Sequence, residues 1–101
     1  MKAQSFIYIL TNKNHSVLYT GVTSNLAQRL YQHQTSIFKN AFNSRYNVFE
    51  LVYFEEFDNI IDAIAREKQI KAGSRQKKIA LIQQFNPEWK DLTKTVHRGL
   101  I

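Results

Sequence analysis

Cysteine is absent from this chain of 101 residues, which excludes a disulfide framework and a thiolate zinc site. Proline occurs once and glycine three times, too rarely for long linkers or a disordered chain. Near the N-terminus, the apolar run Phe6–Leu10 is too short for the core of a signal peptide or for a membrane span. We therefore expect a folded cytoplasmic protein without a membrane anchor.

Acidic residues are also scarce. Asp and Glu number 8 against 14 Lys and Arg, which gives a formal net charge of +6. A basic surface attracts a polyanion such as nucleic acid, although a soluble protein can also be basic without such a partner. The length suits a single domain over residues 1–101, and we place its core at about 4–87 and its C-terminal tail at 88–101.

Three segments are rich in β-branched and aromatic residues and are predicted strands: Phe6–Leu10, Val17–Gly21 and Val48–Phe54. Turn formers between the first two predict a hairpin. Alternation places Tyr8 on one face of the first strand, and Tyr19 with Gly21 on one face of the second. The register decides whether these faces coincide, and the sequence leaves it open. Tyrosines on a small sheet belong more often to the core than to an active site.

The first predicted helix runs from Asn25 to about His33 or Gln34, with Ser24 as its N-cap. On a helical wheel, Arg29 and His33 flank the apolar stripe and lie one turn apart, so both side chains face the sheet. An arginine directed at the core of its own domain needs an anionic partner. That partner is either a buried carboxylate or a bound phosphate.

Two more helices are predicted. The earlier one runs from about Ile60 to Lys71 or Ala72, with Asp58 or Asn59 as its N-cap and Gly73 at its exit, and the later one runs to Phe85 with Ser74 as its N-cap. Glu67 falls on the apolar face of the earlier helix. A buried ion is costly without a partner, so Glu67 either pairs with a cation, such as Lys71 one turn later, or binds a metal. The expected fold is α/β of the α+β type, a small, mainly antiparallel sheet of three strands flanked by about three helices.

Basic residues concentrate around the junction of the two later helices. Such a run is usually a solvated face, but it is also the best candidate for a track that binds a phosphate backbone. The segment 35–47, predicted as a loop or a short irregular helix, adds further basic side chains. The predicted nucleic-acid-binding residues are Lys39, Arg45, Arg66, Lys68, Lys71, Arg75, Lys77 and Lys78.

Six polar residues occur in a suggestive order along the chain: Tyr8, Tyr19, Arg29, His33, Glu67 and Asn86. The sequence around them resembles the GIY-YIG nuclease family, in particular its small stand-alone bacterial branch. Phe6-Ile7-Tyr8 is similar to the first signature tripeptide, and Tyr19-Thr20-Gly21 to the second. Phe6 replaces the first signature glycine and Thr20 the second signature isoleucine, but neither position supplies a reacting group. Asn86-Pro87-Glu88-Trp89 is similar to the ending of the stand-alone branch.

This resemblance implies the GIY-YIG fold and a metal-dependent endonuclease that hydrolyses phosphodiester bonds of DNA in repair, recombination or processing. It implies that Glu67 holds one divalent cation, Mg²⁺ or Mn²⁺, completed by water and phosphate oxygens. Arg29 would stabilise charge on the phosphoryl oxygens.

The resemblance also assigns roles to the remaining polar residues. Tyr8 is the first choice for the group that helps to deprotonate the attacking water, with Tyr19 as a positioning partner. Free tyrosine titrates near 10, so this role needs a depressed pKa or a proton relay. His33 is either that relay or a phosphate ligand, and Asn86 supports the geometry of the site.

The main alternative is a nucleic-acid-binding module that keeps the nuclease fold but does not cleave. An inward glutamate favours the enzyme, because a pure binder has no need of one. A protein-interaction module would explain the aromatic residues but not the polar set. We expect a monomer or weak homodimer with little intrinsic sequence specificity, which a protein partner can supply. The sequence does not distinguish DNA from RNA.

Overall fold

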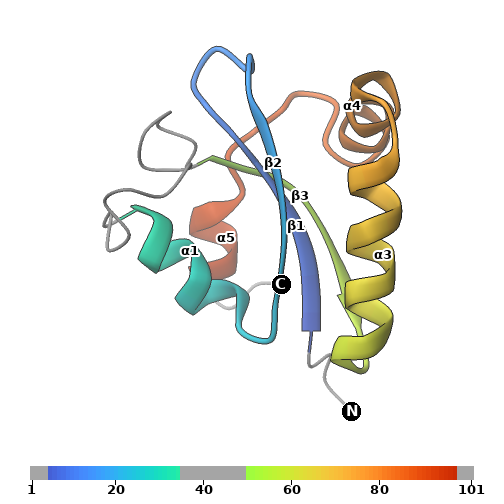
Figure 1. Ribbon diagram of the computed structural model, residues 1–101. Helices are drawn as coiled ribbons and strands as arrows, with labels where there is room; N and C mark the ends of the chain where they lie inside the picture. The colour runs from blue at the N-terminus through green and yellow to red at the C-terminus, as the bar shows by residue number, and fades with distance from the viewer. Residues whose placement is uncertain (1–4, 35–49, 98–101) are drawn as a thin grey trace.

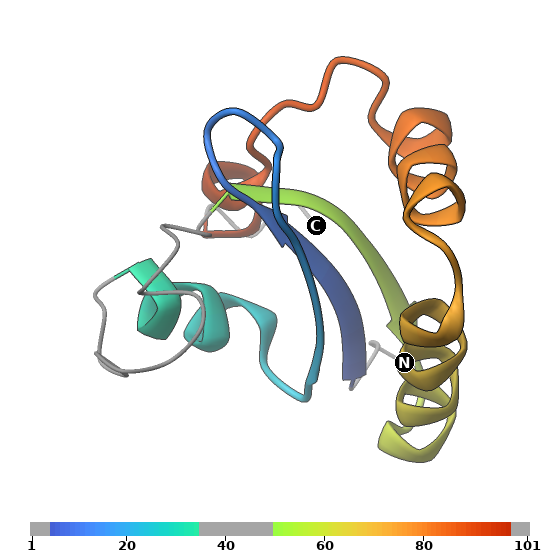
Figure 2. The same cartoon turned by 45° about the horizontal axis from the view of Figure 1, so that its top comes forward.

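A three-stranded antiparallel sheet lies between two layers of helices. The computed structural model of the protein describes residues 5–34 and 50–97. The sheet has the strand order β2-β1-β3, and both views show α1 and α5 on one side of it and α3 and α4 on the other (Figure 1 and Figure 2). The elements are β1 (Ser5–Thr11), β2 (Leu18–Thr23), α1 (Leu26–Gln34), β3 (Glu50–Phe57), α3 (Ile60–Ala72), α4 (Arg75–Phe85) and α5 (Thr93–His97).

The predicted fold class is therefore confirmed, and the predicted tail contains a short further helix, α5. Each predicted strand is shifted or extended by one to three residues, because strand ends carry no sharp sequence signal. The part of the third strand before Glu50 lies outside the described residues, as does the segment 35–47.

The central strand β1 buries side chains on both of its faces. Ile7 and Ile9 pack with Ile70 and other apolar residues of α3, α4 and β3. Tyr8 and Leu10, which alternate with them, pack with residues of α1 and β3. A strand that is apolar on both alternating sets of positions has to be covered on both sides, and the two helical layers provide that cover.

The N-caps of α3 and α4 follow the sequence prediction. Asn59 precedes α3 and its side chain accepts a hydrogen bond from the Asp62 backbone N–H, while Ser74 does the same for Lys77 at the start of α4. Gly73 closes α3 by donating its backbone N–H to the Ile70 carbonyl at 3.0 Å.

The predicted N-cap of α1 is wrong by one residue. The oxygen that accepts the Gln28 backbone N–H belongs to Asn25, at 3.1 Å, and Ser24 is exposed. Thr23 fixes this position, because its Oγ1 accepts the Asn25 backbone N–H at 3.1 Å and so places Asn25 at the entry of the helix. Serine and asparagine cap equally well, and the sequence alone does not separate them.

The two edge strands of the sheet, β3 and β2, have different neighbours. The outer edge of β3 bonds to the chain after α4, because Leu92 N–H donates to the Leu51 carbonyl at 2.8 Å and Leu51 N–H donates to Asp91 Oδ1 at 3.1 Å. Trp89, Leu92 and Val96 pack on the two apolar clusters, so the tail folds back on the body. The other edge strand is β2, which carries Tyr19 and Gly21.

Within residues 5–34 and 50–97, none of the helices has the length and apolar character needed to cross a membrane.

Candidate active site

Tyr8 reaches the β2 side of the sheet because Gly21 has no side chain. The observed register pairs Tyr8 with Gly21 and Leu10 with Tyr19, so the two faces that the sequence left open do coincide. A Cβ atom at Gly21 would overlap Cζ and Oη of Tyr8. The tip of the Tyr8 ring therefore occupies the space where any other residue would have its side chain, which explains the need for glycine here.

Helix α1 presents His33 to the same ring. Tyr8 Oη lies 3.2 Å from His33 Nε2, and the rings of Tyr8, Tyr19 and His33 are mutual neighbours with centroids 5.9 to 6.4 Å apart. His33 is buried, as the helical wheel predicts for this face. Three side chains that are far apart in the sequence thus meet on the α1 side of the sheet.

Arg29, one turn before His33, adds a positive charge to this group. Its guanidinium hydrogen-bonds to Tyr8, where it can only donate. Because the Tyr8 oxygen accepts from Arg29, the hydroxyl hydrogen is free to donate to His33 Nε2, which favours the tautomer with its proton on Nδ1. Within the described ranges no carboxylate forms an ion pair with Arg29. The sequence prediction offered a carboxylate or a phosphate as its partner, and this geometry favours the phosphate.

Both hydrogen-bonded groups are held in their neutral forms at neutral pH. Burial raises the pKa of Tyr8 above its ordinary value, and the charge of Tyr19 adds to this, while Arg29 opposes it. Burial lowers the pKa of His33 to about 4, and the positive charge of Arg29 contributes in the same direction. The neutral Tyr8 hydroxyl is therefore not a base by itself. It can accept a proton only if its own proton passes to His33 at the same time.

We expect His33 to make stability depend on pH. Its pKa of about 4 in the folded protein lies below the ordinary value of about 6.5 in the unfolded chain, so between these values the unfolded state binds more protons. The neutral His33 therefore contributes fully to the free energy of unfolding above pH 6.5. This contribution falls by on the order of 2 kcal/mol as the pH drops to 4. Urea unfolding at pH 7.5 and 4.5 measures this, and His33→Gln is expected to remove most of the difference. An imidazole NMR titration with a midpoint near 6.5 would contradict it.

Glu67 enters the region from α3, on the opposite side of the sheet. Its side chain is only 14% exposed, and its Oε2 forms an ion pair with Lys71 Nζ at 2.8 Å. The cation partner that the sequence offered is therefore present. The negative charge of Glu67 still contributes to the raised pKa of Tyr8, so the two groups act on each other electrostatically although they lie on different layers.

An open cavity of about 320 Å³ lies beside Tyr19 at the outer strand. Lys71 and Lys78 line it together with Leu18, Tyr19 and Thr20 of β2. It therefore joins a member of the aromatic group to the ion-pair partner of Glu67. Two ammonium groups at a cavity of this size are suited to a phosphate group.

The carboxylate donor set around this cavity is small. Among the residues that the structure describes, no three His, Asp or Glu side chains cluster in the way a protein-only metal site requires. Glu67 alone fits a magnesium-type ion only if water and phosphate oxygens complete its coordination, which is the usual arrangement for that ion. The donor chemistry thus fits the expected single cation at Glu67, in competition with Lys71 for the same oxygen.

Asn86 is the C-cap residue of α4. Its side-chain amide donates to the carbonyls of Val52 at 3.2 Å and Lys90 at 2.9 Å, and its Oδ1 accepts the Lys90 backbone N–H at 3.1 Å. These bonds join α4 to β3 and to the following turn. The expected support of the site by Asn86 stays a prediction, and any such effect acts through the placement of β3.

The predicted basic residues have several different settings. Arg66 binds Glu55 through Nε and Nη2, and Tyr53 donates its hydroxyl to the same carboxylate. Burial and the Glu55 contact raise the pKa of Tyr53 to about 12. Arg75 Nη2 donates to the His15 carbonyl at 2.9 Å. Exposed or half-exposed positions on α3 and α4 are occupied by Lys68, Lys71, Lys77 and Lys78. The remaining two predicted residues, Lys39 and Arg45, lie outside the described part of the chain.

The cluster of Tyr53, Glu55 and Arg66 was missed by the sequence analysis. Glu55 follows an apolar strand and looks like a solvated strand end, and its partner Arg66 looks like one cation in a basic run. Gln69 and Gln84, which line a cavity between α3 and α4, were missed too, because glutamine on a polar helix face carries no distinguishing signal.

Residues 4–80 match the family profile described as the GIY-YIG catalytic domain. The chain belongs to the GIY-YIG family. Tyr8 and Tyr19, which resemble the signature tyrosines of this family, both lie within the matched residues. The resemblance deduced from the sequence is confirmed at the level of the family.

Relatives of this GIY-YIG chain are similar over most of their own length. A UPF0213 protein of Syntrophus aciditrophicus is 35% identical over 86 residues, which cover 85% of this chain and 97% of the relative. A UPF0213 protein of Oceanobacillus iheyensis is 39% identical, covering 82% of this chain and 94% of the relative. The solution NMR structure of a UPF0213 protein from Bacillus halodurans has a TM-score of 0.55 at 31% identity, covering 89% of this chain and 94% of that one.

Proposed function

We propose that this protein is a metal-dependent endonuclease that hydrolyses phosphodiester bonds of nucleic acid, with DNA as the expected substrate. The observation that carries the proposal is the setting of Arg29. Its guanidinium has no carboxylate partner in the described ranges and bonds to a tyrosine hydroxyl that also contacts His33. A permanent cation left without a counter-ion beside a possible proton relay is suited to an anionic substrate whose reaction moves a proton.

In this proposal Arg29 binds the scissile phosphate and stabilises the charge that develops on its oxygens. Tyr8 accepts a proton from the attacking water as its own proton moves to His33 Nε2, so the hydroxyl never becomes an isolated phenolate. The bound phosphate offsets the charge of Arg29, which is one cause of the lowered pKa of His33. Substrate binding therefore makes His33 a better proton acceptor, and Tyr19 holds the relay in position through ring contacts.

Glu67 is the proposed ligand of one divalent cation, Mg²⁺ or Mn²⁺. When bound, such an ion supplies Lewis-acid stabilisation of the phosphate and of its leaving oxygen. To bind the cation, Glu67 has to give up its ion pair with Lys71. The Lys71 side chain is 52% exposed and can turn towards the phosphate at the cavity beside Tyr19. Lys71 then changes from a partner of the carboxylate to a partner of the substrate.

The basic residues Lys68, Lys71, Arg75, Lys77 and Lys78, together with Lys39, Arg45 and Arg66, are proposed to bind the phosphate backbone on either side of the cleaved bond. We further propose that residues 1–101 act as a single domain in the cytoplasm, as a monomer or weak homodimer, in DNA repair, recombination or processing. A protein partner is the proposed source of specificity for a particular site or structure.

The rival function, a binding module that does not cleave, is favoured by one observation. Glu67 Oε2 lies 2.8 Å from Lys71 Nζ, and a lasting ion pair there blocks the only carboxylate proposed for the metal. In that case Arg29 and the basic residues still bind nucleic acid. The two functions therefore differ in cleavage and agree in binding.

A cleavage assay separates the two functions. We expect the purified chain to cut at least one of supercoiled plasmid, branched duplex, single-stranded DNA and RNA when Mg²⁺ or Mn²⁺ is present, and none in a chelator. Gel-shift experiments on the same substrates report binding independently. Binding without cleavage under every ionic condition would support the rival function.

A further inference from the structure

A second cavity, of about 360 Å³, lies between α3 and α4. None of the aromatic residues of the candidate active site lines it, and Lys78 is the residue that it shares with the cavity beside Tyr19. Its volume is within the range of sites that hold a small organic ligand. The two cavities are thus neighbours on one surface of the molecule.

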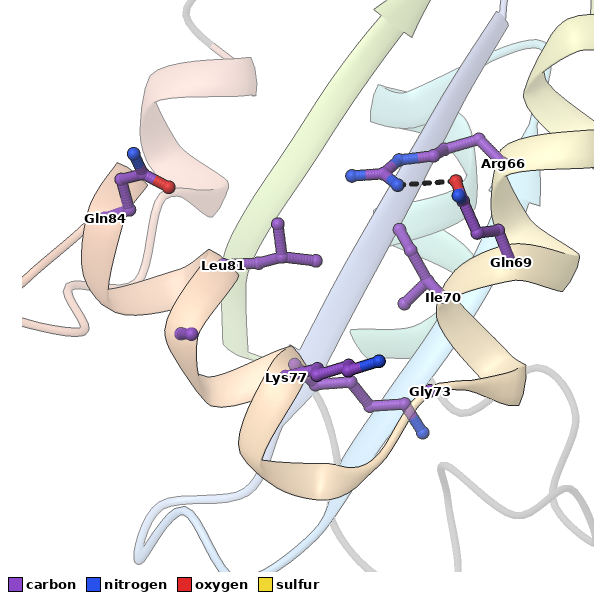
Figure 3. A pocket seen from close by; sticks show the side chains of 9 residues that line it. Arg66, Gln69, Ile70, Gly73, Lys77, Leu81 and Gln84 are labelled. Carbon is purple, nitrogen blue, oxygen red and sulfur yellow. Dashed lines mark hydrogen bonds between the residues drawn. The ribbon is translucent and has the colours of Figure 1, made fainter.

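The inner wall of this second cavity is apolar. Ile70 of α3 is buried and Leu81 of α4 is half-buried, and Figure 3 shows both side chains pointing into the space between the two helices. Gly73, at the turn between the helices, also lines the cavity, and it does so with backbone atoms alone. Ile70 is only 4% exposed, so a flat ring in this cavity would lie mainly against the half-buried Leu81 side chain, which is favourable because that apolar surface leaves water.

A fixed hydrogen-bond donor stands at the edge of this wall. Arg66 Nη1 donates to Gln69 Oε1 at 2.6 Å, as the dashed line in Figure 3 shows, while Nε and Nη2 of the same guanidinium hold Glu55. A guanidinium only donates, so it can pair with the oxygen of the amide and not with its nitrogen. The orientation of Gln69 is therefore set, and its NH₂ group remains to donate to a ligand.

Positive charge lies on the α4 side of the cavity. Lys77 and Lys78 line it, and among residues 5–34 and 50–97 no ion pair joins either ammonium group to a carboxylate. Arg66, in contrast, is already compensated by Glu55. The cavity thus combines an apolar slot, one oriented amide donor and two uncompensated cations.

We propose that this cavity binds one nucleotide of the nucleic-acid substrate, with its base against Leu81 and its phosphate at Lys77 or Lys78. This inference deepens the proposed function and rests on it. Because Lys78 also lines the cavity beside Tyr19, the bound nucleotide lies next to the strand that enters the active site. The Gln69 NH₂ group then donates to an acceptor atom on the edge of the base, and every base has such an acceptor. One such hydrogen bond corresponds to a gain in affinity of about fivefold.

NMR titration of the full chain, without divalent metal, tests this site. The probes are dTMP, thymidine and inorganic phosphate. We expect dTMP to shift the backbone amides of Gln69, Gly73 and Leu81 and to bind more tightly than either of its two halves. Shifts confined to other regions, or equal affinities for dTMP and inorganic phosphate, would overturn the proposal.

Three variants sharpen the test. Gln69→Ala, at an exposed position, is expected to keep the fold and to bind dTMP about fivefold more weakly, and Leu81→Trp fills the slot and is expected to abolish dTMP binding. Gln83→Ala, an exposed position of α4 outside the cavity, is the matched control and is expected to bind as the wild type. Wild-type affinity for dTMP in Gln69→Ala would contradict the proposal.

The two proposals fail separately. A chain that cleaves DNA but shows no dTMP shifts at this cavity refutes the nucleotide site and leaves the nuclease function standing. A chain that binds dTMP there and cuts no substrate refutes the nuclease function alone.

Discussion

Glu67→Ala is expected to abolish metal-dependent cleavage, with a loss on the order of 10³-fold or more, while the protein stays folded. Glu67 is the carboxylate that we propose for the metal, and the structure offers no cluster of acidic and histidine residues in its described part that would replace it. The ion pair with Lys71 adds little to stability, because the lysine is half-exposed and such pairs contribute at most about 1 kcal/mol. Initial cleavage rates and urea unfolding measure the two effects.

Glu56→Ala is the matched control for this variant. Glu56 is an exposed carboxylate of β3, so its removal changes the net charge equally without touching the cavity beside Tyr19. We expect wild-type cleavage from it, and from Glu67→Gln we expect the same loss as from Glu67→Ala, since an amide keeps the shape but not the charge. Full cleavage by Glu67→Ala would refute the assignment of this residue.

Gly21→Ala is expected to lower the free energy of unfolding by on the order of 2 to 3 kcal/mol and to reduce cleavage strongly. The added Cβ would overlap Cζ and Oη of Tyr8, and neither the strand nor the buried ring can move away without disturbing the contact between Tyr8 and His33. For a domain of this size the melting temperature should fall by about 10 to 20 °C. Thermal unfolding and cleavage assays on the purified variant measure both effects.

Gly73→Ala provides the control for the loss of a glycine. Its Cβ would lie 3.3 Å from the nearest atom, the Ile70 carbonyl oxygen, and its φ of −78° is open to any residue, so we expect a change within about 1 kcal/mol. A double-mutant cycle with Tyr8→Ala then isolates the clash. In that background the methyl group of Gly21→Ala has space, so the two substitutions should be strongly non-additive. A Gly21→Ala cost that is unchanged in the Tyr8→Ala background would contradict the account.

Much of the fold follows from local patterns in the sequence. Phe6–Leu10 is apolar at every position, so it was expected to be a strand covered on both sides, and β1 is the central strand. Asn59, Gly73 and Ser74 mark the ends of α3 and α4 through side-chain and backbone chemistry that acts over a few residues. The N-cap of α1 was misplaced because Ser24 and Asn25 are both good caps, and the contact that decides between them comes from Thr23.

The candidate site was predictable in its composition but not in its contacts. Helical spacing placed Arg29 and His33 on one inward face, and it offered Lys71 as a partner of Glu67, which the structure contains. The hydrogen bond between Tyr8 and His33 depends on strand register and on the approach of α1, which join residues 25 positions apart. The role of Gly21 as the space for the Tyr8 ring follows from the same register and was not visible beforehand.

The contacts around Arg66 illustrate what sequence patterns miss. In a basic run, Arg66 looks like one cation among several for a phosphate backbone. In the structure it is bound to Glu55 and sets the orientation of Gln69, so part of its charge is already compensated within the protein. Which cation of such a run is already paired depends on a strand that is distant in sequence, and charge counts do not contain that information.

The most direct test of the central claim is the single-turnover cleavage of one DNA substrate by the wild type and by Glu67→Gln, each with Mg²⁺ and with a chelator. The account predicts cleavage by the wild type with Mg²⁺ alone, and none in the other three reactions, while a gel shift shows that both proteins bind the DNA. Equal cleavage by the two proteins, or cleavage in the chelator, would contradict it.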